Sequence, residues 1–189
     1  FFYTHTPQSA MLRSLVGSEM CIRDRYQAVQ RNEELWDTAF HEMLRHSTSI
    51  GGQPRHNTNE IVMHGVTIPS GSLIHMVDVS ANHDERIFLN PEEFNIFRDD
   101  LYSGKILRSG YNKEGKCSHM AFGVGPHLCP GAWISHQETV IGSQILESAF
   151  RNVRINKERM PKDIDGVSLA PIGLGSIREL WLDFEIPTN

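Results

Sequence analysis

Cys129 lies in the stretch "HMAFGVGPHLCPGAWISHQE", residues 119–138, between glycines, prolines and a histidine. A cysteine thiolate can act as a nucleophile, as half of a redox pair or as a ligand of a soft metal centre. Gly123, Gly125 and Gly131 allow left-handed dihedrals and close backbone approach, while the prolines stiffen the chain. The composition predicts a shaped loop that presents one sulfur atom.

Other uses of this loop fit its residues less well. A dinucleotide-binding loop would need a third glycine where Leu128 stands, together with a preceding strand and a downstream acid. A zinc site would need more ligands than His127, and a redox pair would need a thiol closer than Cys117. A buried structural cysteine remains the main alternative.

A long helix is expected directly after the cysteine. In "GAWISHQETVIGSQILESAFRNV" the apolar residues at helical spacing predict a buried stripe, formed by Ile134, Ile141, Ile145, Ala149 and Phe150. The unpaired amides at the start of a helix carry partial positive charge, which favours an ionised thiolate. A thiolate beside Phe122 would suit a large, soft metal centre.

A second motif lies upstream, in "NEELWDTAFHEMLRHS". Its apolar residues recur at helical spacing and predict an amphipathic helix, with a face formed by Leu35, Trp36, Ala39, Phe40, Met43 and Leu44. Glu42 and Arg45 then lie about one turn apart. A pair of this kind on its own would be a solvated contact worth a few tenths of a kcal/mol.

The segment between the two helices is predicted to form a small antiparallel sheet. His64-Gly65 is a turn between "EIVM" and "VTIP", and "SLIHMVDVSA" is a third β-rich run. Residues 83–100 then form a short helical piece and an irregular segment with a turn at Asn90-Pro91. Its apolar anchors are Phe94, Ile96 and Phe97.

Two further segments have simple patterns. Residues 101–118 are rich in glycine and basic residues, which predicts a surface loop. The tail "LAPIGLGSIRELWLDFEI" places Leu180, Leu182 and Phe184 on one side of a half-buried strand that follows a glycine turn.

The overall composition limits the kind of protein. The chain has 189 residues, 39% of them hydrophobic and 22% charged, which predicts one globular domain with its own core. A net charge of -5 gives no general footprint for nucleic acid or anionic membrane, and no apolar run is long enough to cross a bilayer. Three widely spaced cysteines make a poor disulfide framework, which favours a reducing, cytoplasmic setting.

Residues 1–25 differ from the rest because they show no helical or alternating period. Ser14 to Arg25, "SLVGSEMCIRDR", resembles a translated sequencing adapter. We therefore expect residues 1–25 to be a non-native or disordered leader, in which Cys21 has no function. A poorly ordered natural N-terminus is the alternative.

The two motifs together carry a family resemblance. "FGVGPHLCPG" matches the cysteine loop of the bacterial-type cytochrome P-450 haem-thiolate monooxygenases, with Phe122, Gly125, Cys129 and Gly131 in the fixed places. "EMLR" supplies the family's ExxR pair. The resemblance covers residues 26–189 and implies a mainly helical α+β fold, the C-terminal part of the family's domain. Its order would be ExxR helix, small antiparallel sheet, meander, cysteine loop, long helix and terminal β-hairpin.

The resemblance also implies roles for individual residues. Cys129 would be the axial ligand of the iron in haem b, in a site shaped by Phe122, Gly125 and Gly131. His127 and Arg55 would bind the haem propionates. Glu42 and Arg45 would be structural, in a buried network with Arg98. No catalytic residue beyond the haem ligand is expected in this chain.

The implied activity belongs to a longer protein. It would insert one oxygen atom from dioxygen into a small organic substrate, with electrons from a ferredoxin-type partner. The basic residues Lys105, Arg108, Lys113 and Lys116 would dock that partner. The part before the ExxR helix is missing, so the chain alone is expected to be inactive. A non-catalytic haem-binding remnant and a globular scaffold with a structural Cys129 are the alternatives.

Overall fold

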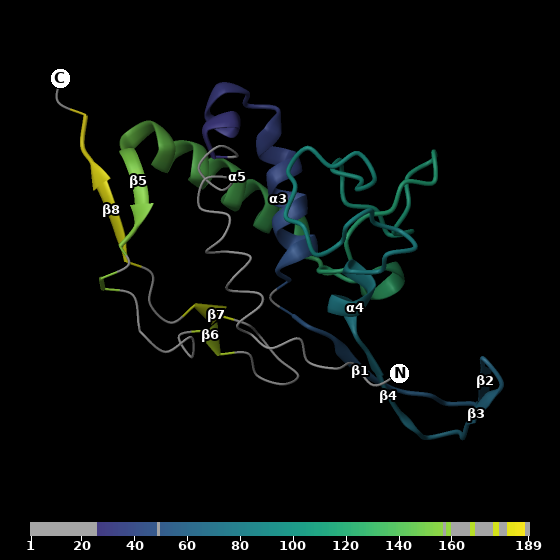
Figure 1. Ribbon diagram of the computed structural model, residues 1–189. Coiled ribbons are helices and arrows are strands. Elements are labelled where there is room, and N and C mark those ends of the chain that lie inside the picture. Colours follow the sequence, from purple (N-terminus) through teal and green to yellow (C-terminus); the bar gives the residue numbers. More distant parts are fainter. Residues whose placement is uncertain are drawn as a thin grey trace.

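The computed structural model describes residues 26–48, 50–156, 158–159, 167–168, 176–177 and 181–187. Its two longest helices are α3, Leu35–His46, and α5, Ala132–Ala149, which pack against each other (Figure 1). The short helix α4, Asp78–Asn82, also packs against α3. Asp37 in the first turn of α3 and Arg45 in the last match the helix dipole, which stabilises both ends.

The described strands form separate antiparallel pairs. β1, Gln53–His56, pairs with β4, Leu73–Met76, and β2, Ile61–Met63, pairs with β3, Val66–Ile68. β5, Arg151–Ile155, pairs with β8, Leu182–Glu185, and β6, Val167–Ser168, pairs with β7, Ser176–Ile177. The β2–β3 hairpin projects from the end of the β1–β4 pair, as Figure 1 shows.

The predicted turn of the β2–β3 hairpin is confirmed. His64 and Gly65 have φ angles of 49° and 79°, which match the right-handed twist of the flanking strands. The β-rich run over residues 72–81 is only half a strand, because β4 ends at Met76 and α4 begins at Asp78. β4 has only the four residues of β1 as its partner, and the chain turns into a helix once that pairing ends.

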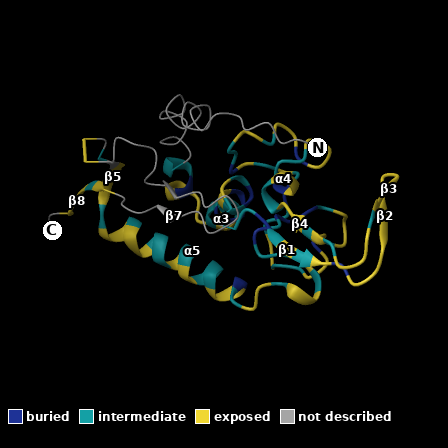
Figure 2. Cartoon of the chain, turned by 90° about the horizontal axis from the view of Figure 1, so that it is seen from below, coloured by how far each residue is buried: buried dark blue, intermediate teal, exposed yellow. Residues whose placement is uncertain are grey.

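The buried interior is small and unusually polar. Its apolar cluster consists of Phe88, Leu101 and Cys117, with Met120 packed against it. Among the largest fully buried side chains, by contrast, are Arg45, His41, Glu42 and Asn82. These side chains lie around α3 and α4, the dark blue region in Figure 2. The interior therefore depends on matched hydrogen bonds as well as on apolar packing.

Four predictions of buried apolar residues are wrong. On β8, Leu182 and Phe184 are exposed, while Asp183 is half-buried. On α5, Ile134, Ile141 and Ile145 are exposed, and much of the helix is coloured as exposed in Figure 2. On α3, Met43 is exposed while Glu42 and Arg45 are buried. In the irregular segment Ile96 is buried, but Phe97 is exposed.

The order of elements otherwise agrees with the predicted fold class. A helix, small antiparallel sheets, an irregular segment, the cysteine loop, a long helix and terminal antiparallel pairs follow one another. The predictions for residues 1–25 and for Leu180 lie outside the described residues. None of the helices in the described part is both long and apolar enough to cross a bilayer.

Candidate functional site

Cys129 lies between a 3-10 turn, η1, Gly125–His127, and the first residue of α5. The amide of Cys129 donates a hydrogen bond to the carbonyl of Phe122 over 2.9 Å, and its carbonyl accepts one from Ala132 over 3.2 Å. The residue is exposed and its thiol forms no disulfide. The loop thus presents a free sulfur at a helix N-terminus.

The loop glycines differ in what they contribute. Gly123 and Gly125 have φ angles of 68° and 70°, in the region that favours glycine. Gly131 has an ordinary φ of -83°, so it does not use the left-handed freedom that a glycine allows. A Cβ at Gly131 would lie 3.8 Å from the sulfur of Cys129. Gly131 therefore leaves space beside the sulfur.

Phe122 joins the loop to α3. Its ring stacks on that of buried Phe40, with 6.4 Å between the ring centroids and 26° between the planes. The contact fixes the aromatic residue at the start of the loop against the helix that carries Glu42 and Arg45.

Glu42 and Arg45 form a fully buried pair. Nε of Arg45 donates to one carboxylate oxygen of Glu42 over 2.7 Å, and Nη2 donates to the other over 2.9 Å. The remaining Arg45 donors reach the carbonyls of Asn82, Pro91 and Glu93. Arg98 lies 3.4 Å from the carboxylate of Glu42, so the structure brings the three predicted residues together.

Asn82 connects this buried network to the cysteine loop, and sequence reasoning missed it. Its carbonyl accepts from Arg45, and its side-chain oxygen accepts from the amide of Met120 over 2.7 Å. Asn82 itself is fully buried. The only local signal is its place at the end of a short β-rich run, which does not reveal a contact with a residue far along the chain.

Arg55 and His127 lie on different elements. Arg55, in β1, donates to the side-chain oxygen of Gln53 over 2.8 Å, and the amide nitrogen of Gln53 lies 3.8 Å from where a Cβ at Gly123 would stand. His127 is exposed in η1. The strand therefore passes beside the cysteine loop, and Gln53 is a further residue of the site that the sequence did not indicate.

Residues 101–118, which we call the basic loop, contact the cysteine loop directly. The amide of Gly125 donates to the carbonyl of Arg108 over 2.7 Å. Lys105, Arg108, Cys129 and Trp133 help to line one cavity of about 480 Å³. Lys105, Arg108 and Lys113 are exposed, while Lys116 is half-buried. Positive charge therefore borders the cysteine.

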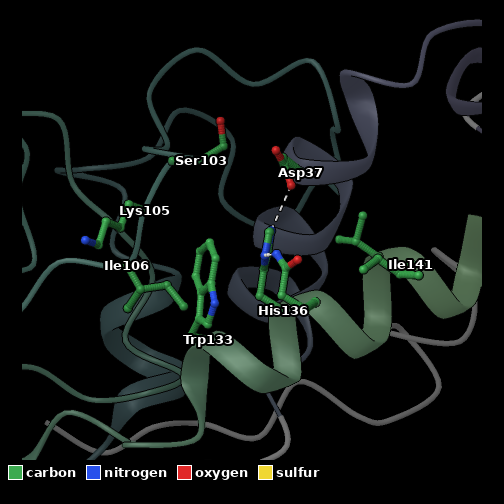
Figure 3. Close-up of a pocket in the computed structure, with 10 residues that line it drawn as sticks. Asp37, Ser103, Lys105, Ile106, Trp133, His136 and Ile141 are labelled. Carbon is green, nitrogen blue, oxygen red and sulfur yellow. Dashed lines mark hydrogen bonds and ion pairs between the residues drawn. The ribbon is translucent and has the colours of Figure 1, made fainter.

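A second cavity, of about 270 Å³, lies between α3, α5 and the start of the basic loop. Figure 3 shows Asp37 of α3 and His136 of α5 in contact at its edge, with 2.8 Å between the carboxylate and Nε2. Trp133, Ile106 and Ile141 supply apolar walls, so the cavity combines an ion pair with apolar surface.

The residues around Cys129 fit a haem. A free, exposed thiol is a suitable thiolate ligand for iron. A Cβ at Gly125 would meet nothing within 4 Å, so there is open space beside the loop. Arg55 and His127 provide nitrogen donors suited to carboxylates.

Comparison with known proteins identifies the family of the chain. A family model, Cytochrome P-450, matches residues 23–174. The chain therefore belongs to the cytochrome P-450 family, and membership implies a haem cofactor.

Two curated relatives show how much of such a protein is present. Pulcherriminic acid synthase of Bacillus subtilis is 30% identical over 130 residues, which are 69% of this chain and 31% of that protein. Steroid C26-monooxygenase of Mycobacterium tuberculosis is 30% identical over 124 residues, 65% of this chain and 29% of that protein. The chain thus spans less than a third of the length of either relative.

Solved structures give the same fold. The haem domain of CYP116B5 from Acinetobacter radioresistens matches with a TM-score of 0.69 at 27% identity, over 92% of this chain and 38% of that one. Substrate-free CYP109E1 from Bacillus megaterium matches with a TM-score of 0.71 at 21% identity, over 94% and 40%. The second likeness shows the fold alone.

Proposed function

We propose that the chain is the C-terminal haem-binding part, residues 26–189, of a longer cytochrome P-450 monooxygenase. The observation that carries this proposal is the free, exposed Cys129 at the start of α5, in a loop hydrogen-bonded to the buried network of Glu42 and Arg45. The longer protein would insert one oxygen atom from dioxygen into a small organic substrate. Residues 1–25 would lie outside this unit.

Each residue of the site has a proposed part in holding the cofactor. Cys129 would ligate the iron of haem b, and thiolate ligation favours the O–O cleavage that such a haem supplies when bound. Phe122 and the glycines would shape the surface that meets the ring. Arg55 and His127 would donate to the propionates, since charged donors form the stronger hydrogen bonds to carboxylates.

The competing scaffold function is less well supported. A structural cysteine should be buried, and that description fits Cys117, which packs with Phe88 and Leu101. Cys129, by contrast, is exposed and does not pack in the apolar cluster. Both cysteines are free, which supports a reducing, cytoplasmic setting.

A haem titration of the longer protein tests the proposal. We expect one haem per chain and, after reduction and addition of carbon monoxide, the red-shifted Soret band of a thiolate-ligated haem. Turnover with a surrogate oxidant would then distinguish an enzyme from a non-catalytic remnant. A carbon monoxide complex with the spectrum of a histidine-ligated or unligated haem would contradict the proposal.

The basic loop gives a prediction about the electron donor. We propose that Lys105, Arg108, Lys113 and Lys116 steer an acidic ferredoxin toward the cavity beside Cys129. Neutralising all four should slow ferredoxin-driven reduction by about 10-fold or more at low salt and flatten its salt dependence. Stopped-flow reduction over a salt series measures both.

The control for this experiment is a set of basic residues away from the loop. Neutralising the exposed Arg86, Arg151 and Arg154 changes the net charge but not the charge beside Cys129. Substrate affinity should be unchanged in both variants. Equal salt slopes for the wild type and the loop variant would show that the ferredoxin docks elsewhere.

A further inference from the structure

Two buried histidines share a hydrogen bond beneath the cysteine loop. His41 of α3 and His119, at the start of the loop, are only 2% and 4% exposed. Nδ1 of His41 lies 3.1 Å from Nε2 of His119. This contact does not belong to the Glu42–Arg45 network, and it joins α3 to the cysteine loop by a separate route.

The surrounding groups determine which nitrogens carry protons. The amide of Ala121 donates to Nδ1 of His119 over 3.3 Å, so the proton of a neutral His119 is on Nε2. Nε2 then donates to Nδ1 of His41, which places the His41 proton on its own Nε2. The backbone of Gly104 accepts that last hydrogen bond. Each hydrogen bond in this series is therefore donated in the same direction, from Ala121 towards Gly104.

This chain of bonds links three parts of the molecule. Ala121 and His119 lie at the beginning of the cysteine loop. His41 belongs to α3, and Gly104 belongs to the basic loop. Gly104 also lines the cavity of Figure 3, beside Asp37 and His136. The rings of Phe40 and Phe122 pack against these histidines and complete the enclosure.

Both rings are held in the neutral form. Burial, helped by nearby His136 and opposed by Asp37, lowers the pKa of His41 to about 4. Burial also lowers the pKa of His119 to about 3, with a smaller contribution from His41. These are the titratable groups that act on the pair. A proton added to Nδ1 of His41 would leave two donors facing each other across the shared bond, and a proton added to Nδ1 of His119 would face the donating amide of Ala121.

We propose that His41 and His119 are positioning residues, whose directed hydrogen bonds hold the cysteine loop on α3; a proton on His41 breaks the bond between the rings, and a proton on His119 breaks the bond from Ala121. The inference rests on the proposed function, because the loop they seat would carry the haem ligand. It predicts that acid releases the thiolate from the iron before the protein unfolds as a whole.

The sign and size of the effect follow from linkage. A released histidine has a pKa near 6.5, so the released state binds more protons than the seated state between about pH 6.5 and pH 4. The contact between the cysteine loop and α3 is therefore most stable above about pH 6.5 and weakens as the pH falls. For each ring, release becomes about 20- to 25-fold more favourable at about pH 5 than at neutral pH.

Substitutions of His41 separate the hydrogen bond from the titration. His41→Asn keeps an acceptor where Nδ1 stands but does not titrate, whereas His41→Leu removes the bond. In the longer haem-loaded protein, the thiolate Soret band of the carbon monoxide complex is measured as a function of pH. In the wild type, the logarithm of the released fraction should decrease as the pH rises. In His41→Asn the slope of this plot should be smaller by about one, because one proton fewer is taken up on release. His41→Leu should lose the band already at neutral pH.

His64→Asn, on the exposed β2–β3 turn, is the matched control.

A second measurement does not depend on ligation. The ¹⁵N shifts of the imidazoles should show both rings neutral at about pH 6, with the proton of each on Nε2. Failure of the wild type to show a thiolate band would overturn the proposed function, while the ¹⁵N shifts would still test the histidine pair. A wild-type pH profile in both His41 variants, or Nδ1 protonation of either ring, would overturn the inference.

Discussion

Cys129→Ser should abolish the thiolate Soret band of the reduced carbon monoxide complex in the longer protein, because a serine oxygen cannot replace the soft thiolate. Cys117→Ser should leave the band unchanged. Burial raises the pKa of the Cys117 thiol, and that thiol already donates to the carbonyl of Ser118, a bond that a serine can keep. Absorbance spectra of the three proteins provide the measurement.

Cys21→Ser is the second control for this prediction, since residues 1–25 are proposed to lie outside the haem-binding unit. It should bind haem with the spectrum of the wild type. An intact thiolate band in Cys129→Ser would require another ligand and would remove Cys129 from the site.

Glu42→Ala and Arg45→Ala should each destabilise the longer protein by about 3–5 kcal/mol, because each leaves a buried charge without its partner. Arg45→Ala should be the more damaging, since it also deprives the carbonyls of Asn82 and Pro91 of a donor. Arg45→Lys should not restore stability, because an ammonium group has only three donors and no planar fork. Urea unfolding measures the free energies, and haem content reports the consequence for the site.

The double substitution Glu42→Ala with Arg45→Ala should cost less than the sum of the single ones, since neither charge is then left alone. Arg86→Ala is the matched control, because its pair with Asp84 is exposed and should matter little. Near-normal stability and haem content in both single variants would contradict a buried, coupled pair.

Local patterns explain the parts of the structure that the sequence predicts. A two-residue hairpin turn needs two residues in the left-handed region, and His64-Gly65 between short apolar runs meets that need. This pattern can be recognised without knowledge of any tertiary contact. The spacing of Glu42 and Arg45 follows from one helical turn. The glycines and prolines around Cys129 predict a loop for the same reason, although they do not predict that Gly131 has ordinary backbone angles.

Contacts between distant segments could not be predicted in this way. Asn82 accepts from Met120, and His41 meets His119, because the fold brings α3 and α4 beneath the cysteine loop. Neither pair has a periodic signal, and Asn82, His41 and His119 each look like an ordinary polar position in the sequence. Exposed Ile141 on α5 shows the reverse case, where helical period predicts an apolar stripe but not whether anything covers it.

The buried hydrogen bonds beneath the cysteine loop limit how the loop can move. A loop resting on aliphatic side chains can shift slightly at little cost, since dispersion contacts change gradually with distance. A loop bonded to Asn82 and His41 cannot, because hydrogen bonds weaken steeply with angle and a buried unpaired donor costs about 1–3 kcal/mol. The sulfur of Cys129 is therefore held in one discrete place, and it would leave that place in a single step and not by gradual drift.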